Sequence, residues 1–209
     1  SLFKGFESFA EAELVKKNVE WAPRSLSMKR VSGRKNIEST VIWNNDGGIL
    51  SESRVPELDL TEVFPLENWM RAKVLDPYSA VLRLIDQVEA TGKCDARFEI
   101  YDGRRRSRLY FETSGKTKLE PDRPYGFLGD TIVCSVRFDP IGGHRIESKW
   151  RSKMDDEDRF KLFLGRLNQG QLLPVRIELK SWFGKIVGRL DTRRIQFSNG
   201  LIKSKAASK

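Results

Sequence analysis

The chain has 209 residues, of which 38 are Lys or Arg and 29 are Asp or Glu, so its formal net charge is +9. The length suits one large domain or two small ones, and the 39% of hydrophobic residues exclude a fully disordered chain. No apolar run approaches the roughly 18 residues of a membrane-spanning helix, and the basic excess fits nucleic acid, an anionic membrane surface or simple solubility.

Alternation of apolar and polar residues with a period of two predicts strands along most of the chain. The weaker candidates lie at 7–16, 25–31, 36–43, 48–53, 145–151, 158–166 and 185–198. The clearest candidates lie at 94–101, 131–139 and 171–182. Asp102-Gly103 predicts a tight hairpin turn after the first of these. Segments 54–70 and 113–129 are predicted to be long connections.

One segment has helical spacing instead. Asp76 is suited to be the N-cap, Pro77 the first helical residue, and Gly92 the residue that ends the helix. The apolar residues between them recur every three or four positions, which is typical of an amphipathic helix. We expect it to pack on a sheet or to plug the open end of one.

Many antiparallel strands and one helix indicate an all-β, mainly antiparallel fold. The alternatives are a closed barrel, an open half-barrel or a strongly curved sheet. We expect one β-rich domain over 1–202 and a basic, disordered tail over 203–209.

The chain has two cysteines, Cys94 and Cys134, each on the apolar side of its predicted strand. They could be two buried free thiols, which are common in cytosolic proteins. We favour a disulfide, which would place the protein in an oxidising compartment.

The sequence offers little for catalysis. His144 is the single histidine and follows two glycines in a predicted turn, with no nucleophile at a recognisable spacing. We therefore expect a structural histidine, and keep an enzyme that uses His144 or Lys116, for example a hydrolase, as an alternative. One His and two Cys cannot build a transition-metal site, so we expect neither metal nor cofactor.

The densest basic cluster consists of Arg104, Arg105, Arg106 and Arg108, at the predicted hairpin turn. It can contact a phosphate, a lipid headgroup or a glycan, or it can be a solvated hairpin that resists edge pairing. Proteins that bind nucleic acid usually interleave basic and exposed aromatic residues. Here the aromatic residues of the strands lie on the core side, which weakens that alternative.

Four segments stand out in the sequence, namely Val74–Ala80, Cys94-Asp95 leading into Tyr101–Arg105, Thr131–Cys134 leading into Pro140–His144, and Leu173–Leu179. In this order and spacing they resemble a bacterial envelope family known as domain of unknown function 3108. The resemblance covers about residues 1–198, and the cysteines and Leu-Pro-Val-Arg are similar to the alphaproteobacterial version.

The resemblance implies an exported, periplasmic protein with a β-rich, barrel-like domain, and it also favours the Cys94–Cys134 disulfide. Members usually begin with further strands before Phe3–Phe6, so we expect N-terminal strands and a signal peptide to lie upstream of Ser1. The family has no established catalytic residues to carry over.

We therefore expect a non-enzymatic periplasmic protein, peripheral to the membrane at most, that binds a lipid, a lipoprotein or another envelope protein rather than nucleic acid. The four arginines are the expected rim of the site. The expected apolar interior, which could equally be ordinary core, consists of Phe98, Ile100, Phe111, Phe138, Leu173, Val175 and Ile177.

Overall fold

The computed structural model describes residues 6–32, 35–147, 160–167, 170–181, 184–191, 195–198 and 201–204. Its helical elements are η1 (Leu60–Glu62), η2 (Asn68–Arg71) and α1 (Pro77–Thr91). Its strands are β1 (Phe6–Lys17), β2 (Glu20–Ser32), β3 (Lys35–Trp43), β4 (Ile49–Val55), β5 (Ala96–Tyr101), β6 (Arg106–Leu119), β7 (Gly129–Gly142), β8 (Phe160–Arg166), β9 (Leu172–Ser181), β10 (Gly184–Arg189), β11 (Ile195–Ser198) and β12 (Leu201–Ser204).

The strands form two main antiparallel sheets. One has the order β1-β2-β3-β4 and the other β10-β9-β8-β7-β6-β5, while β11 and β12 form a separate hairpin. Within the described ranges neither order closes on itself, so the fold is the open, curved alternative among those predicted from the sequence. The all-β, mainly antiparallel class with one α-helix is confirmed in this part of the chain.

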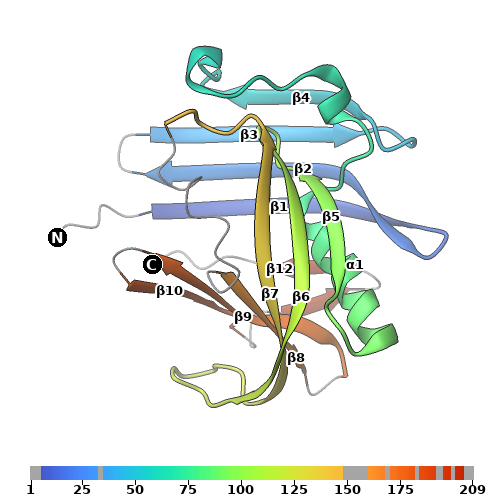
Figure 1. Cartoon of the computed structure of the whole chain (residues 1–209), viewed down its shortest axis with the longest axis vertical. Coiled ribbons are helices and arrows are strands. Elements are labelled where there is room, and N and C mark those ends of the chain that lie inside the picture. The colour runs from blue at the N-terminus through green and yellow to red at the C-terminus, as the bar shows by residue number, and fades with distance from the viewer. Residues whose placement is uncertain are drawn as a thin grey trace.

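The two sheets share a small core, in which Leu26 of β2 and Val41 of β3 are in one cluster with Tyr101 of β5. Strands β5, β6 and β7 cross in front of the four-stranded sheet, with α1 packed behind them (Figure 1). The helix contacts β2, β5 and β9. Arg83 ties it to the first sheet, because its Nε donates to the Trp21 carbonyl at 2.6 Å and its guanidinium pairs with Glu20 at 2.7 Å.

Helix α1 begins and ends as its sequence predicts. The Asp76 carboxylate accepts from the Tyr78 backbone N–H at 2.8 Å and from that of Ser79, which satisfies donors that a first helical turn leaves free. Gly92 follows with φ of 71°, a left-handed conformation that glycine adopts without steric cost. The buried face of the helix includes Leu84 and Val88.

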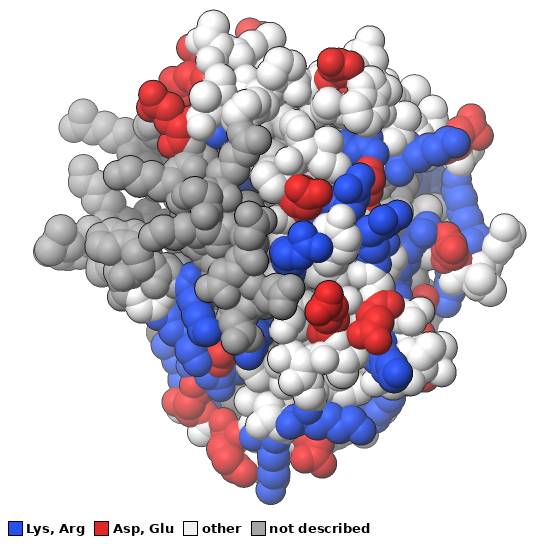
Figure 2. Space-filling view, viewed as in Figure 1, with Lys and Arg blue, Asp and Glu red and all other residues white. Residues whose placement is uncertain are grey.

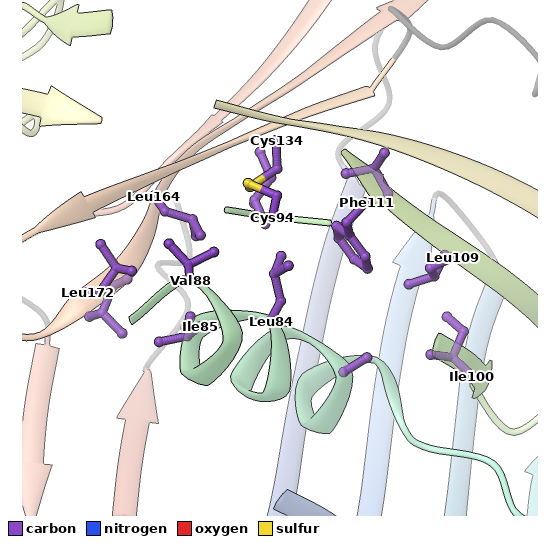
Figure 3. Packing of buried hydrophobic residues seen from close by; sticks show 14 residues of the cluster. Leu84, Ile85, Val88, Cys94, Ile100, Leu109, Phe111, Cys134, Leu164 and Leu172 are labelled. Atoms are coloured by element: carbon purple, nitrogen blue, oxygen red, sulfur yellow. A yellow bond between two sulfur atoms is a disulfide. The ribbon is translucent and has the colours of Figure 1, made fainter. Parts of the chain in front are cut away.

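Cys94 and Cys134 form a disulfide, as the sequence predicted. Both are fully buried, and the bond joins the segment before β5 to β7 across β6. Figure 3 shows it above α1, among side chains of the largest hydrophobic cluster that include Leu84, Val88 and Phe111. The bond is therefore part of the core between the helix and the six-stranded sheet.

Two local expectations were wrong. The connection predicted at 113–129 begins only after Leu119, because β6 continues and pairs with β7 up to Leu119↔Gly129. The expected tight turn is a four-residue loop, 102–105, in which Gly103 has a positive φ and Asp102 does not. At the C-terminus, β12 includes Lys203 and Ser204, and residues 205–209 lie outside the described part of the chain.

Candidate functional site: an arginine cluster at the hairpin tip

The turn between β5 and β6 is built around the buried Asp102. Its carboxylate accepts from the backbone N–H groups of Arg104 and Arg105 at 3.1 and 2.7 Å, and from Arg105 Nε at 2.7 Å. Burial raises the pKa of Asp102, but the Arg105 charge and these hydrogen bonds outweigh it, so the pKa lies below its ordinary value. A carboxylate with these partners organises a turn longer than two residues.

The hairpin tip lies against β3. A Cβ atom on Gly103 would be 2.9 Å from Cγ2 of Val41, so only glycine fits without a shift. On the other side, a Cβ on Gly143 would be 1.8 Å from the Arg104 carbonyl oxygen. The tip is therefore held between the first sheet and the segment that follows β7.

Two of the four predicted rim arginines are neutralised within the sheet. Arg108 pairs with Glu99 at 2.7 Å and with Asp139 at 3.5 Å. Arg106 is buried, pairs with the same Glu99, and lies 5.5 Å from the centre of the Trp69 ring. Acidic and basic side chains are interleaved on the face of the molecule that carries β5–β7 in Figure 1 (Figure 2). Arg106 and Arg108 thus serve the sheet rather than an external ligand.

The other two predicted residues, Arg104 and Arg105, have basic neighbours from distant parts of the chain. Arg54 of β4 is opposite Ser39 of β3, against which the hairpin tip packs. Arg145 follows β7 and forms an isolated bridge with Val63. We call Arg54, Arg104, Arg105 and Arg145 the arginine cluster.

The arginine cluster has fewer acidic partners than it has arginines. Arg105 pairs with Asp102, and Arg145 pairs with Glu62 at 3.2 Å. Among the described residues, the side chains of Arg54 and Arg104 have no ion pair, and Arg54 Nε is buried without a hydrogen-bond partner. Burial and the charge of Arg105 lower the pKa of Arg104 to about 10; the Asp102 carboxylate raises it, and the charges of Arg54 and Arg145 lower it further. Such a site gains most from an anion that supplies the missing acceptors.

Half of the arginine cluster was predicted from the sequence. Arg104 and Arg105 stand out as neighbours in the sequence, whereas Arg54 and Arg145 are brought in by strand register and by the contact at Gly143. One signal in the sequence concerns Arg145: the Gly142-Gly143 pair just before it allows the backbone there to lie close to the backbone of Arg104. No comparable signal marks Arg54.

His144, the candidate for catalysis, makes two contacts through one nitrogen. Its Nε2 lies 3.1 Å from Ser107 Oγ and 3.1 Å from the Arg106 carbonyl oxygen. A carbonyl oxygen only accepts, so Nε2 carries the proton there and is not free to take one from Ser107. Burial is the main reason that the pKa of His144 lies below its ordinary value. The arrangement suits a structural link better than a general base.

Most of the predicted interior residues are core. Phe98, Ile100, Phe111, Phe138 and Leu173 belong to the cluster that packs against α1. Val175 belongs instead to a cluster with Val133 and Phe163, because the β8–β9 register shifts between Phe163 and Leu164. Ile177 is 38% exposed, since the residue opposite it in β10 is Gly188, which has no side chain to cover it.

Neither a metal centre nor a membrane-spanning helix is found in the described part of the chain. Within the described residues, no group of three or more His, Cys, Asp or Glu side chains is placed to hold a metal ion. None of the helices in that part of the chain has the length and apolar character needed to cross a bilayer.

The fold and the site define an open, disulfide-bonded, two-sheet β protein with a partly uncompensated cationic cluster at one hairpin tip. The chain belongs to the family described as "Protein of unknown function (DUF3108)", whose model matches residues 17–191. No curated protein and no solved structure matches the chain.

Proposed function

We propose that the chain is a non-enzymatic, exported envelope protein whose arginine cluster binds the anionic headgroup of an amphipathic ligand, a lipid or a lipoprotein. The observation that carries the proposal is the pair of arginines, Arg54 and Arg104, that lack an ion pair within the described residues. A phosphate group offers several acceptor oxygens and matches guanidinium geometry. The disulfide supports a periplasmic location, because such bonds persist in oxidising compartments.

Exposed apolar side chains next to the arginine cluster support the amphipathic part of the ligand. Leu60 and Ile146 are both exposed, and the segments that carry them are joined because the Ile146 backbone N–H donates to the Glu62 carbonyl at 3.0 Å. The exposed ring of Trp69 lies against Arg106 at the start of β6. Apolar and aromatic groups beside arginines are typical of surfaces that rest on a membrane interface.

We assign the ligand contact to the arginine cluster rather than to the apolar side of the six-stranded sheet. Helix α1 packs against that side, and its Leu84 and Val88 are in one cluster with Phe111 and Leu173. An acyl chain bound there would have to replace the helix. Lipid extraction and native mass spectrometry of the purified protein test the interior site separately.

The test is flotation with vesicles of phosphatidylglycerol and, for comparison, of phosphatidylcholine. A basic residue near an anionic surface contributes about 1 kcal/mol, which is about fivefold in affinity. The double variant Arg54→Gln/Arg104→Gln is therefore expected to bind phosphatidylglycerol about 25-fold more weakly. The matched control is Arg97→Gln/Arg123→Gln, because it also removes two arginine charges, from exposed positions on β5 and in the loop after β6.

The outcomes separate the alternatives. Equal loss for Arg97→Gln/Arg123→Gln and for Arg54→Gln/Arg104→Gln would mean that net charge alone drives binding, which contradicts the proposal. Inorganic phosphate that competes as well as the vesicles would identify a free anion as the ligand. Tighter binding to a DNA duplex than to vesicles would favour the nucleic-acid alternative, and circular dichroism of each variant verifies folding.

A further inference from the structure

An open groove runs along the outer edge of the first sheet. Its volume is about 510 Å³, and it is lined by Gly48, Ile49, Leu50, Ser51 and Glu52 on one side and by Asn68, Arg71 and Ala72 on the other. Figure 1 shows short helical turns beside β4, at the edge of the sheet away from β3. Successive side chains of a strand point to opposite faces, so consecutive residues can line one groove only along the strand's edge. The groove therefore exposes the backbone of β4.

Strand β4 has a paired neighbour on one side only in the described part of the chain, namely β3. An edge strand presents a row of N–H and C=O groups that can pair with another chain. Here η2 (Asn68–Arg71) stands opposite that row and forms the far wall of the groove. The site thus combines a hydrogen-bonding edge with a second wall.

Each of the other three edge strands of the two main sheets, as far as the structure describes them, has a feature that discourages pairing. The outer side of β5 is occupied by Leu75, whose N–H donates to Glu99 at 2.9 Å and whose carbonyl accepts from Tyr101 at 2.8 Å. Charged residues are frequent in β1 at Glu7, Glu11, Glu13, Lys16 and Lys17, and β10 carries glycines and charges at Gly184, Lys185, Gly188 and Arg189. Charges are a usual means of blocking edge pairing.

Strand β4 has less of this protection where it lines the groove, because Arg54, its charged residue without an ion pair among the described residues, lies outside the groove lining. Leu50 and Val55 are 69% and 67% exposed, and Ser51 and Ser53 between them are uncharged. The charge of Glu52 is engaged, because it pairs with Arg71 at 3.2 Å and accepts from the Tyr101 hydroxyl at 2.6 Å. The register shift between β3 and β4 makes Leu50 the extra residue of a bulge, a feature that can redirect a side chain.

We propose that this groove binds an extended peptide segment of a partner protein, which adds to β4 as a further strand. Five residues of strand extend about 16 Å, so a segment of about five residues fills the lined stretch. Uncharged, β-branched residues suit it, because they pair well with Leu50 and the serines across a strand pair. A second copy of the chain fits less well, since η2 stands where its sheet would have to enter.

The proposal is tested with a random octapeptide library displayed on phage and selected on the immobilised, oxidised protein. Enriched peptides are expected to contain a run of uncharged β-branched residues and to slow amide hydrogen exchange at β4. Methylation of alternate backbone nitrogens of an enriched peptide leaves its side chains intact but removes edge donors. It is expected to abolish binding when it falls on the donors that face β4.

Two variants of equal charge localise the binding. Leu50→Lys places a charge in the groove and is expected to weaken an enriched peptide about tenfold or more. Val55→Lys places the same charge on the same strand at a similarly exposed position outside the groove lining, and is expected to change affinity less than about twofold. Absence of enrichment, equal effects of the two variants, or dimerisation that Leu50→Lys prevents would each overturn the proposal.

Discussion

The buried disulfide is where stability can be calculated from chain geometry. Cys94 and Cys134 are separated by 40 residues in the sequence. In the chain-entropy model, closing a loop of that length lowers the entropy of the unfolded chain by about 13 cal/mol/K, which is about 4 kcal/mol at 25 °C. Reduction is therefore expected to lower the free energy of unfolding by about 4 kcal/mol and the melting temperature by roughly 8–16 °C.

The assay compares urea unfolding curves of the oxidised and reduced wild-type protein, followed by circular dichroism. Both forms keep the same side chains at the fully buried positions 94 and 134, so the comparison isolates the cross-link from a change of packing. The variant Cys94→Ala/Cys134→Ala is the control, since reductant should leave its curve unchanged. The reasoning would be refuted by a difference in the free energy of unfolding below about 1 kcal/mol, which is well under the value expected for the loop. It would also be refuted if two free thiols were titrated in the denatured, unreduced protein.

Three further predictions concern single residues. Gly143→Ala is expected to destabilise the protein by about 3 kcal/mol or more in urea unfolding, because it adds a clash to the strain of a positive φ. Gly47→Ala, also at positive φ but with nothing within 4 Å of the added Cβ, should cost only about 1–2 kcal/mol. Leu84→Ala removes a fully buried side chain of α1, so it should cost about 2–5 kcal/mol in the same assay, and a loss below about 1 kcal/mol would contradict its core position. Because burial lowers the pKa of His144, the wild type should lose stability relative to His144→Gln as the pH falls below about 6.5; parallel curves of stability against pH between about 8 and 5 would contradict this.

Local rules predicted the elements whose causes are local. Asp76, Pro77 and Gly92 are capping residues, and they mark the ends of α1 within a residue. Cys134 lies on the buried side of β7 and Cys94 lies two residues before β5, and the alternation of the sequence alone predicted that both are in the core. These features depend on interactions within a few residues or on one buried face, which a sequence pattern records directly.

Features that depend on pairing between strands were harder to predict. The second half of β6 is polar and exposed, from Glu112 to Lys118, so no alternation indicates a strand, yet its backbone pairs with β7. The bulge at Val175 turns the side chain of this residue to the face opposite the one expected from alternation. Pro174 is the one residue beside it that marks the bulge in the sequence. Arg54 and Arg145 were not predicted for the same reason, because they come near Arg104 and Arg105 only through strand pairing and through contacts of the hairpin tip with distant segments.

The pairing pattern of the strands also has a consequence for oxidative folding. Each strand of the two main sheets pairs with its immediate predecessor or successor in the sequence, so hairpins can form in order from local contacts, which favours rapid folding. Once β5, β6 and β7 have paired, the two sulfur atoms are neighbours across β6. Because the chain has two cysteines in all, one intramolecular disulfide is possible, and no mispaired isomer of that bond has to be reshuffled.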